Sequence, residues 1–445
     1  MVNQRNDSIK YFHILYCAGI TLGFIFSLIY SNNQIITGDQ LQMLNKGYLG
    51  ASKGLWLSYG NAASAVGNVP GSLSAYIVGI PLKIWFSPWA PMIMLILLRF
   101  SSFLLFDSIV KKVFGQKTRL LFLILYWLNP WFLFESLLYN PSYLCFFTAL
   151  HFWSAFNMHQ TKSVTLSFIH FLSIGLAAQL HYSWPILLII TSYLIYRKII
   201  IVHWRGFFIA IIVITASLIP YIQELLSNEA ISKNADINAQ KKYIGWGGVH
   251  VYPVLKAFLY WLRYGAFIFS DQITLGANFK WISSEEQVQS LAVYIWRISL
   301  YTIGGISLII SLIANKDLWL QAAPSILKKE KKHNLTLESW ITLYVFSAFI
   351  GVTISAILSP IIFNHWHLII IFPIAIFPLT IYIIKHTEEE EEEEDNTYKY
   401  KKITIGLLIY FTLINIVASQ DSSKFTTSSN YSQQVLTNIN FSTLK

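Results

Sequence analysis

The sequence predicts an all-α polytopic membrane protein with about 11 transmembrane helices, and three observations carry this prediction. The composition is 55% hydrophobic and 12% charged, whereas average soluble domains hold about 25% charged residues. Apolar runs of membrane-spanning length recur from one end of the chain to the other. Lysine and arginine gather in alternate connections between these runs, which is the positive-inside pattern.

The apolar runs place the predicted spans in order along the chain. They lie at 11–30, 90–110, 119–135, 141–157, 163–180, 184–197, 205–225, 291–313, 338–362, 366–385 and 402–419. Several fall short of the roughly 20 residues that a perpendicular helix needs, so kinks or local thinning are expected. The first run has no small-residue cleavage site, so we interpret it as a retained helix and not as a signal peptide. An odd number of spans places the N-terminus in the cytoplasm and the C-terminus outside.

The distribution of charge supports this orientation. The predicted external turns at 136–140, 181–183 and 363–365 contain no lysine or arginine. The predicted cytoplasmic connections are rich in both: Lys111, Lys112, Lys117, Arg119, Arg197, Lys198, Arg205, Lys328, Lys329, Lys331, Lys332, Lys385, Lys399, Lys401 and Lys402. The acidic run Glu388–Asp395 also falls on the cytoplasmic side, where we interpret it as a solvated loop because acids contribute little to orientation.

Two further stretches, 71–87 and 252–269, are apolar enough to enter a membrane. If one of them spanned it, every later element would be inverted. In the second stretch Lys256 and Arg263 are seven residues apart on one helix face, opposite aromatic residues, which is typical of a helix lying in the membrane interface. We therefore predict that both stretches lie on the outer surface.

These assignments give one transmembrane domain, 1–419, with external loops at about 31–89 and 226–290 and a polar external tail at 420–445. Membrane-lying helices are expected in the first of these loops. No inverted pair of hydropathy blocks is evident, which disfavours a transporter because many transporters contain such repeats.

Several function classes are disfavoured by the sequence. It contains no Walker loop, GxGxxG, HExxH or GxSxG motif, so nucleotide-driven chemistry is not expected. The net charge of +10 is explained by orientation and anionic lipid headgroups, and no nucleic-acid partner is expected. Cys17 and Cys145 lie in apolar runs and are interpreted as packing residues.

Polar residues from distant parts of the sequence are predicted to share the outer membrane level. They are Asp39, Glu135, Tyr139, Asn140, His181, His365 and His367. Each also has a structural explanation, because Asp39 can begin a helix, Glu135 and Asn140 can cap helix ends, and the histidines can be interfacial. The His–Trp–His spacing is a weak metal signal because no third ligand is identifiable, so no metal or other cofactor is predicted.

Arg99 differs from these residues because it lies well inside the second predicted span. A cation there costs about 2.5–3.5 kcal/mol on the insertion scale. A buried partner or an anionic ligand is therefore expected, and snorkelling of the side chain toward the interface is the alternative.

The order of these motifs resembles the C-type (GT-C) membrane glycosyltransferases, especially the branch of protein O-mannosyltransferases and aminoarabinose transferases of lipid A. The first external loop of that family begins with an acid, which "TGDQ" matches as Asp39, with Gln40 where a second acid is usual. "RFSSFLLFDSIVKKVFG" is similar to the family's arginine-containing second span, which aligns Arg99.

Three later segments extend the resemblance. In "LNPWFLFESLLYNPSYLCFFTAL" Asn140 occupies the place of the family's second external acid, and Glu135 could replace that acid only if it points inward. "GLAAQLHYSWPILLI" places His181 at a turn where many members have Lys-Gly-Pro, and "HWHLIIIFPIAIFP" resembles a late helix start of the family. The resemblance covers about residues 11–200, with a weaker match at 360–380.

The resemblance implies transfer of a sugar from a polyprenyl-phosphate donor to an acceptor on the outer face, with inversion. Asp39 would accept the proton of the acceptor, and an ordinary carboxylate pKa near 4 would keep it ionised. Cations would stabilise the leaving phosphate, and the candidates are Arg99, His181, Lys241, Lys242 and Arg263. The candidate substrate-binding residues are Glu135, Tyr139, Asn140, His365 and His367.

The expected acceptor is a cell-surface glycolipid, a polysaccharide or a protein, and the expected location is a bacterial cytoplasmic membrane. A transporter or flippase of lipid-linked sugars, with Arg99 as a phosphate gate, is an alternative function. A catalytically altered structural membrane component is a second alternative.

Overall fold

Helices form where the sequence has its apolar runs, and the predicted all-α, polytopic membrane architecture is confirmed. The computed structural model describes residues 2–33, 38–63, 67–235, 251–269, 271–274, 279–327, 335–359, 363–388 and 395–420. Three sequence features lie outside the described residues: Lys241 with Lys242, the acidic residues 389–394 and the tail 421–445.

In the described part of the chain, 7 helical stretches are long and apolar enough to cross a membrane. They belong to α1 (Val2–Asn32), α4 (Trp89–Phe114), α10 (Trp204–Ser227), α15 (Glu286–Leu327), α16 (Leu337–Leu358), the stretch His365–Thr387 and α20 (Asp395–Gln420). The stretch from His365 consists of α17 (His365–Leu368), η4 (Ile369–Ile371), α18 (Phe372–Ala375) and α19 (Phe377–Glu388). The count of about 11 spans remains a prediction.

The other predicted spans form shorter helices. These are α5 (Thr118–Tyr126), α6 (Pro130–Phe134), η1 (Asn140–Tyr143), α7 (Leu144–Gln160), α8 (Val164–Ala178) and α9 (Pro185–Tyr196). The predicted span 119–135 divides into α5 and α6 because Pro130 has no N–H to continue the helical ladder. Asn129 begins the new helix by accepting a backbone hydrogen bond at 3.0 Å. This break leaves Glu135 at the end of α6, inside the protein.

α15 is longer than the predicted span at 291–313. It has 42 residues, which corresponds to about 63 Å of helix against a hydrocarbon core of about 30 Å. α15 therefore extends well beyond the thickness of a bilayer core.

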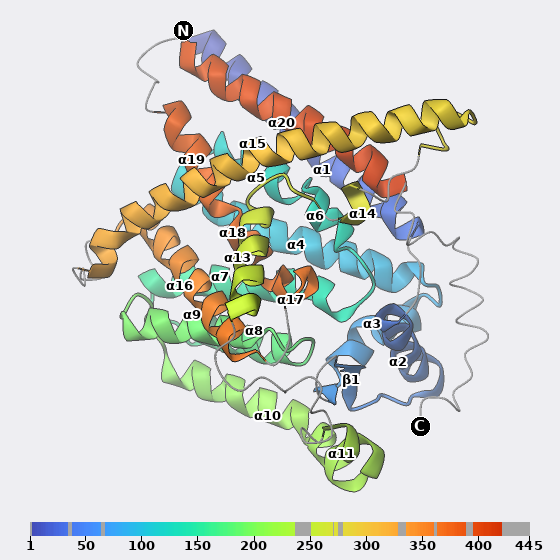
Figure 1. Cartoon of the computed structure of the whole chain (residues 1–445). Coiled ribbons are helices and arrows are strands. Elements are labelled where there is room, and N and C mark those ends of the chain that lie inside the picture. The colour runs from blue at the N-terminus through green and yellow to red at the C-terminus, as the bar shows by residue number, and fades with distance from the viewer. Residues whose placement is uncertain are drawn as a thin grey trace.

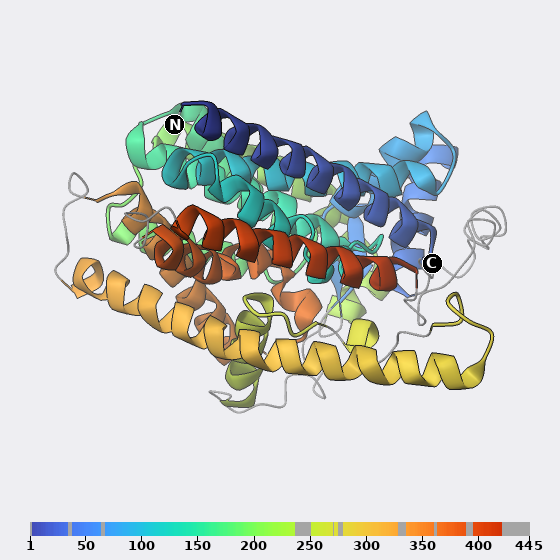
Figure 2. The ribbon, with the colours of Figure 1, turned by 90° about the horizontal axis from the view of Figure 1, so that it is seen from above.

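α1 and α20 lie side by side and run in the same direction (Figures 1 and 2). Phe12 packs against Tyr400 near their starts, and Asn33 Nδ2 donates to the carbonyl of Ser419 at 2.7 Å near their ends. Parallel helices start on the same side of a membrane, so the described chain crosses an odd number of times and its two ends lie at opposite ends of the bundle. The side that each end faces remains a prediction.

The first predicted external loop folds into a small unit at one end of the bundle (Figure 1). It comprises α2 (Asp39–Lys53), the antiparallel strands β1 (Tyr59–Ala62) and β2 (Asn68–Pro70), and α3 (Leu73–Ile84). α2 and α3 approach closely because Gly47 has no side chain, since a Cβ there would lie 2.9 Å from the backbone nitrogen of Gly79. α3 has 12 residues and, at about 18 Å, is too short to cross a bilayer.

The second predicted external loop contributes α11 (Glu229–Ala235), α13 (Val251–Tyr264) and α14 (Asp271–Thr274). α13 has 14 residues and, at about 21 Å, is also too short to span. The two cations of this helix make their contacts within the protein. Lys256 Nζ donates to Asn364 Oδ1 at 2.9 Å and Arg263 Nη2 donates to the carbonyl of Phe269 at 2.6 Å. The exposed face of α13 is apolar instead: Val251, Tyr252, Leu255 and Leu259.

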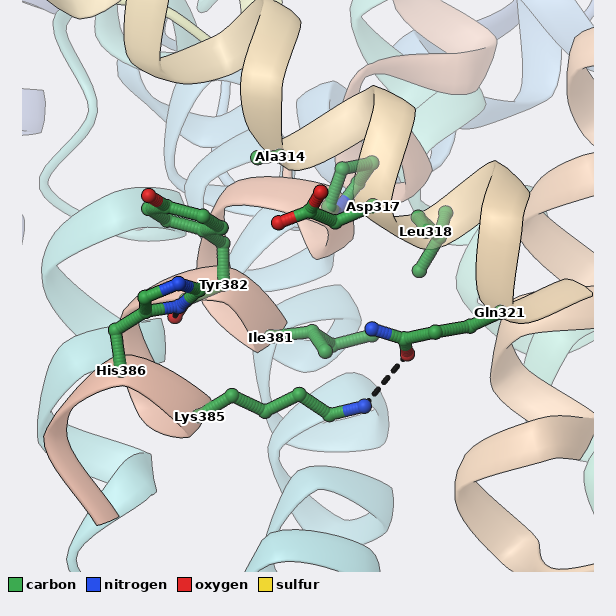
Figure 3. A pocket seen from close by; sticks show the side chains of 9 residues that line it. Ala314, Asp317, Leu318, Gln321, Ile381, Tyr382, Lys385 and His386 are labelled. Carbon is green, nitrogen blue, oxygen red and sulfur yellow. Dashed lines mark hydrogen bonds between the residues drawn. The ribbon is translucent and has the colours of Figure 1, made fainter. Parts of the chain in front are cut away.

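α19 lies along α15, and their facing side chains line a small pocket (Figure 3). Asp317 comes from α15, and Lys385 and His386 come from α19. Lys385 Nζ donates to Gln321 Oε1 at 2.5 Å and forms an ion pair with Glu338 at 2.6 Å. These contacts join α15, α16 and α19 at the end of the bundle opposite to α2 and α3.

Candidate active site

The predicted base, Asp39, is the first residue of α2, and a lysine that the sequence analysis did not select lies two turns later. Gly38 precedes the helix with φ 51°, a backbone conformation that favours glycine. Lys46 is seven residues after Asp39, so the two side chains share one face of α2. Lys46 is 3% exposed, and its Nζ lies 5.7 Å from the centre of the Tyr59 ring.

Asp39 and Lys46 influence the pKa of each other. The Asp39 side chain remains accessible, yet the surrounding chain removes enough water to raise its pKa above the ordinary value, an effect that Lys46 opposes. The expectation of an ordinary pKa near 4 for Asp39 is therefore wrong. Burial lowers the pKa of Lys46 to about 8, and Asp39 opposes that change. Asp39 is consequently a stronger proton acceptor than an ordinary surface aspartate.

Two asparagine side chains connect the unit of α2, β1, β2 and α3 to the turns that follow α6 and α8. Asn61 Nδ2 donates to the carbonyl of Asp39 at 3.0 Å and to Asn140 Oδ1 at 3.4 Å. Asn140 Nδ2 donates to the carbonyl of Leu180 at 2.6 Å. Because carbonyl oxygens only accept, these bonds determine the orientation of both amides. This amide bridge, Asn61 with Asn140, holds Asp39 in place relative to the turn that carries His181.

A second polar group, the buried triad of Tyr139, Glu135 and His365, lies deeper in the bundle. The hydroxyl of Tyr139 donates to Glu135 Oε2, and His365 Nδ1 pairs with Glu135 Oε1. Glu135 is 1% exposed, so it points inward as the resemblance required. Tyr139 and Asn140 are neighbours in sequence, and they therefore connect the buried triad to the amide bridge.

The histidines at 181 and 367 pack against each other, with ring centroids 5.6 Å apart. The backbone N–H of Ser183 donates to His181 Nδ1 at 3.2 Å, and that of Asn364 donates to His367 Nδ1 at 2.9 Å. Burial lowers the pKa of His181 to about 4, so its imidazole is neutral at pH 7. A neutral imidazole can offer a hydrogen bond to a phosphate, and the cationic role of His181 remains a prediction.

Arg99 lies inside α4 and is 2% exposed. Its guanidinium stacks on the Phe132 ring, with the guanidinium carbon 3.7 Å from the ring centre. Among the described residues, no acceptor meets the buried Nη1. Glu135 is near enough to interact electrostatically with Arg99, but its oxygens are occupied by Tyr139 and His365. The alternative of a snorkelling arginine is therefore wrong.

Arg263 joins the same region from α13. Its guanidinium carbon lies 5.3 Å from the centre of the Trp131 ring, and Trp131 also packs against His365. Trp131 precedes Phe132, on which Arg99 stacks. One short helix, α6, thus presents aromatic rings to both arginines.

Five of the eleven predicted site residues meet in the two groups defined above: Asp39 and Asn140 at the amide bridge, and Glu135, Tyr139 and His365 in the buried triad. Arg99 lies inside α4, in agreement with its predicted place within the second span, and Glu135 of the buried triad is also buried. α2, which begins with Asp39, lies at one end of the bundle (Figure 1). Lys241 and Lys242 lie outside the described residues. The site therefore runs inward from a surface carboxylate to buried cations.

Sequence reasoning missed Lys46 and Asn61. The helical spacing of seven residues from Asp39 is a signal that could have selected Lys46. Asn61 lies in a polar hairpin with no motif, and its importance depends on Asn140, 79 residues away in sequence. Within the described ranges, no group of three or more His, Cys, Asp or Glu side chains is arranged to hold a metal ion.

No protein-family model matches the sequence, and no curated protein matches it. Solved structures do share its fold. ArnT from Cupriavidus metallidurans in the apo state superposes with a TM-score of 0.53 at 8% sequence identity, covering 97% of this chain and 76% of that one. The same protein bound to undecaprenyl phosphate gives a TM-score of 0.51 at 8% identity, covering 96% and 75%. The chain is therefore an integral membrane protein with an ArnT-like fold, which agrees with the fold expected from the resemblance.

Proposed function

We propose that the chain transfers a sugar from a polyprenyl-phosphate donor to an acceptor at the outer face of the membrane, with inversion. The acceptor is a glycolipid, a polysaccharide or a protein of the cell surface, and the membrane is a bacterial cytoplasmic membrane with the N-terminus inside. The observation that carries the proposal is the buried guanidinium of Arg99, which lacks an ion-pair partner among the described residues.

A buried, unpaired cation is costly, and proteins retain such groups where a ligand supplies the counter-charge. A guanidinium offers a planar fork of donors that fits two phosphate oxygens. The polyprenyl-phosphate donor supplies this anion together with an apolar chain that belongs in the bilayer. Arg263 adds positive charge near this position, since it packs on Trp131, the neighbour of the Phe132 on which Arg99 stacks.

The other half of the reaction needs a base for the acceptor, and we assign this role to Asp39. Its carboxylate is accessible, and its raised pKa increases its affinity for a proton. The amide bridge fixes the backbone of Asp39, so its side chain starts from a defined place. Attack by the acceptor oxygen on the face opposite to the phosphate accounts for the proposed inversion.

The fold is compatible with this chemistry, because the ArnT structure with the same architecture was obtained with undecaprenyl phosphate bound. We extend this ligand class to the present chain. We propose no metal for the transfer, since Asn140 stands where the family resemblance places a second acid. No nucleotide is required, because the donor already carries its leaving phosphate.

The test is the Asp39→Asn variant, assayed with lipid-linked sugars extracted from the native membrane. The amide preserves the shape of the side chain but cannot accept a proton, so transfer should fall by about 10²–10⁴-fold while donor binding is retained. Asp317→Asn, in the pocket between α15 and α19, is the matched control and should leave transfer unchanged.

A transporter or flippase would respond differently to the same variant. A transporter would carry the lipid-linked sugar across the bilayer and would not require proton transfer at the first loop. Its Asp39→Asn variant would therefore transport the lipid-linked sugar at the normal rate. Full activity of this variant would therefore refute the proposed base and favour the transporter.

A further inference from the structure

His365 is held in one orientation by contacts to its ring and to its backbone. Nδ1 pairs with Glu135, and the carbonyl of His365 accepts a hydrogen bond from the hydroxyl of Tyr264 at 2.7 Å. The ring packs against Trp131 and Phe134, with centroid distances of 5.7 Å and 5.6 Å. A side chain fixed in this way loses little further freedom when it meets a ligand.

The hydrogen bonds of the buried triad also determine which nitrogen carries the exchangeable proton. The hydroxyl of Tyr139 donates to Glu135 Oε2, so Oε1 accepts the Nδ1 proton of His365. Nε2 is consequently the nitrogen that gains or loses a proton. In the part of the chain that the structure describes, no side chain pairs with Nε2, and the His365 side chain is 15% exposed. A structural histidine in a core would have both nitrogens satisfied.

The charges around this histidine favour an anion beside it. Arg263 and His365 contact the same Trp131 ring, and Arg99 lies within electrostatic range of Glu135. Asp39 and the amide bridge present a carboxylate and amides instead, which suit hydroxyl groups. The phosphate of the donor is therefore expected on the side of His365, and the acceptor on the side of Asp39.

We propose that His365 is a catalytic residue that protonates the departing phosphate, an inference that rests on the transferase function proposed above. The acceptor oxygen forms a bond to the anomeric carbon as the bond between that carbon and the phosphate oxygen breaks, and the phosphate oxygen keeps the electron pair. It receives the Nε2 proton of the His365 imidazolium, which becomes neutral imidazole. Asp39 takes the acceptor's proton, and exchange with water returns both groups to their starting states.

Glu135 and Tyr139 act as positioning residues, and the Glu135 carboxylate stabilises the imidazolium as a buried carboxylate does in a catalytic triad.

Several ionisable groups surround His365 and belong in any account of its pH dependence. Glu135 contacts His365 directly, and Tyr139 contacts Glu135. The other ionisable groups in this region are Arg99 on α4, Lys256, Tyr260, Arg263 and Tyr264 on α13, His181 in the α8–α9 turn and His367 on α17. Of these, Glu135 is the group whose charge directly opposes loss of the imidazolium proton.

The test measures binding of undecaprenyl phosphate to the full-length protein in lipid nanodiscs across about pH 5.5 to 8.5. This probe is the carrier product of the proposed reaction, so the sugar need not be known. The wild type is compared with His365→Gln, which keeps a hydrogen-bonding side chain but cannot carry the charge. The ratio of wild-type to variant affinity should be about tenfold higher at the acidic end of this range than at the basic end, because only the imidazolium makes a charge-assisted hydrogen bond to the phosphate.

Variants of the positioning residues give shifts of opposite sign. Glu135→Gln removes the carboxylate that stabilises the imidazolium, so the midpoint of this pH dependence should move to lower pH. Tyr139→Phe leaves more negative charge on Glu135, so the midpoint should move to higher pH. His386→Gln, a histidine distant from this site that stacks on Tyr382 at a centroid distance of 4.0 Å (Figure 3), is the control that should change nothing.

Identical pH profiles for the wild type and His365→Gln would refute the role of His365 while leaving the proposed function intact. If His365→Gln does not fold, the two positioning variants carry the test, and midpoints that do not move in opposite directions would refute it. Failure of the wild type to bind undecaprenyl phosphate at any pH would refute the proposed function together with this inference.

Discussion

Replacing Arg99 by methionine should make the protein more stable while it weakens donor binding. A cation in the centre of a bilayer costs about 2.5–3.5 kcal/mol. Its stacking on Phe132, at 3.7 Å, returns about 1–2 kcal/mol. Methionine keeps an apolar stem of similar length, so we expect Arg99→Met to raise the free energy of unfolding by about 1–2 kcal/mol.

The same variant removes the fork that is proposed to hold the phosphate. Hydrogen bonds to a charged group contribute about 1.5–3 kcal/mol each. Part of this loss is offset, because the ligand-bound wild type is relieved of the cost of burying an unpaired cation. A net loss of about 2–3 kcal/mol corresponds to an increase of about 30- to 150-fold in the Kd for undecaprenyl phosphate. Titration in nanodiscs measures this change directly.

Arg119 provides the matched control because it is a paired arginine. Its Nη2 lies 2.5 Å from Asp107 Oδ2, and their side chains are 18% and 3% exposed. Arg119→Met leaves Asp107 buried without its partner and should lower the free energy of unfolding by about 3 kcal/mol, with no effect on Kd. Unfolding in mixed micelles measures both variants. A destabilised Arg99→Met protein, or one with normal Kd, would refute the assignment of Arg99 as a ligand site.

The remaining predictions concern the unit of α2, β1, β2 and α3, and the dependence on metal. Because the folded pKa of Lys46 is about 8 and its ordinary value is 10.5, the unfolded chain binds more protons between these values, so the free energy of unfolding should rise with pH across this window. Thermal unfolding should show the rise in the wild type and not in Lys46→Met. Gly47→Ala would place a Cβ 2.5 Å from Val78 Cγ1 and should lower stability by about 1–3 kcal/mol in the same assay. Asn61→Ala breaks the amide bridge and should lower the initial rate of donor consumption about tenfold, as about 1–2 kcal/mol of positioning is lost. EDTA should leave this rate unchanged, and a rate restored only by a divalent metal would contradict the metal-free proposal.

The sequence predicted the helical class and the location of nearly every helix because membrane spans are determined by local composition. It failed where a boundary depends on one residue or on tertiary contacts. Pro130 divides a run that hydropathy treats as continuous. α15 continues well past residue 313 because its polar end, beyond the apolar run, keeps helical geometry against α16 and α19.

The convergence of Asp39, Asn140, Glu135 and His365 was predictable, because polar residues at the same ends of successive spans face a common region. Their partners were not predictable. Asn61 matters only because its amide bonds the carbonyl of Asp39 and the side chain of Asn140, and such contacts leave no pattern in sequence.

The orientation of α13 shows a further limit of pattern analysis. An amphipathic helix with two cations on one face has the same sequence pattern whether that face meets water or a polar protein interior. Lys256 and Arg263 bind Asn364 and the carbonyl of Phe269, respectively. The apolar face of α13 is the exposed one. The tertiary contacts of the helix determine which of these two orientations it adopts.

The central claim is most directly tested by mass spectrometry of polyprenyl-linked sugars from cells that lack the protein. The account predicts that one glycosyl carrier accumulates, that the wild-type gene restores its normal level, and that the gene for Asp39→Asn does not. An unchanged pool of carriers in the absence of the protein would contradict the account.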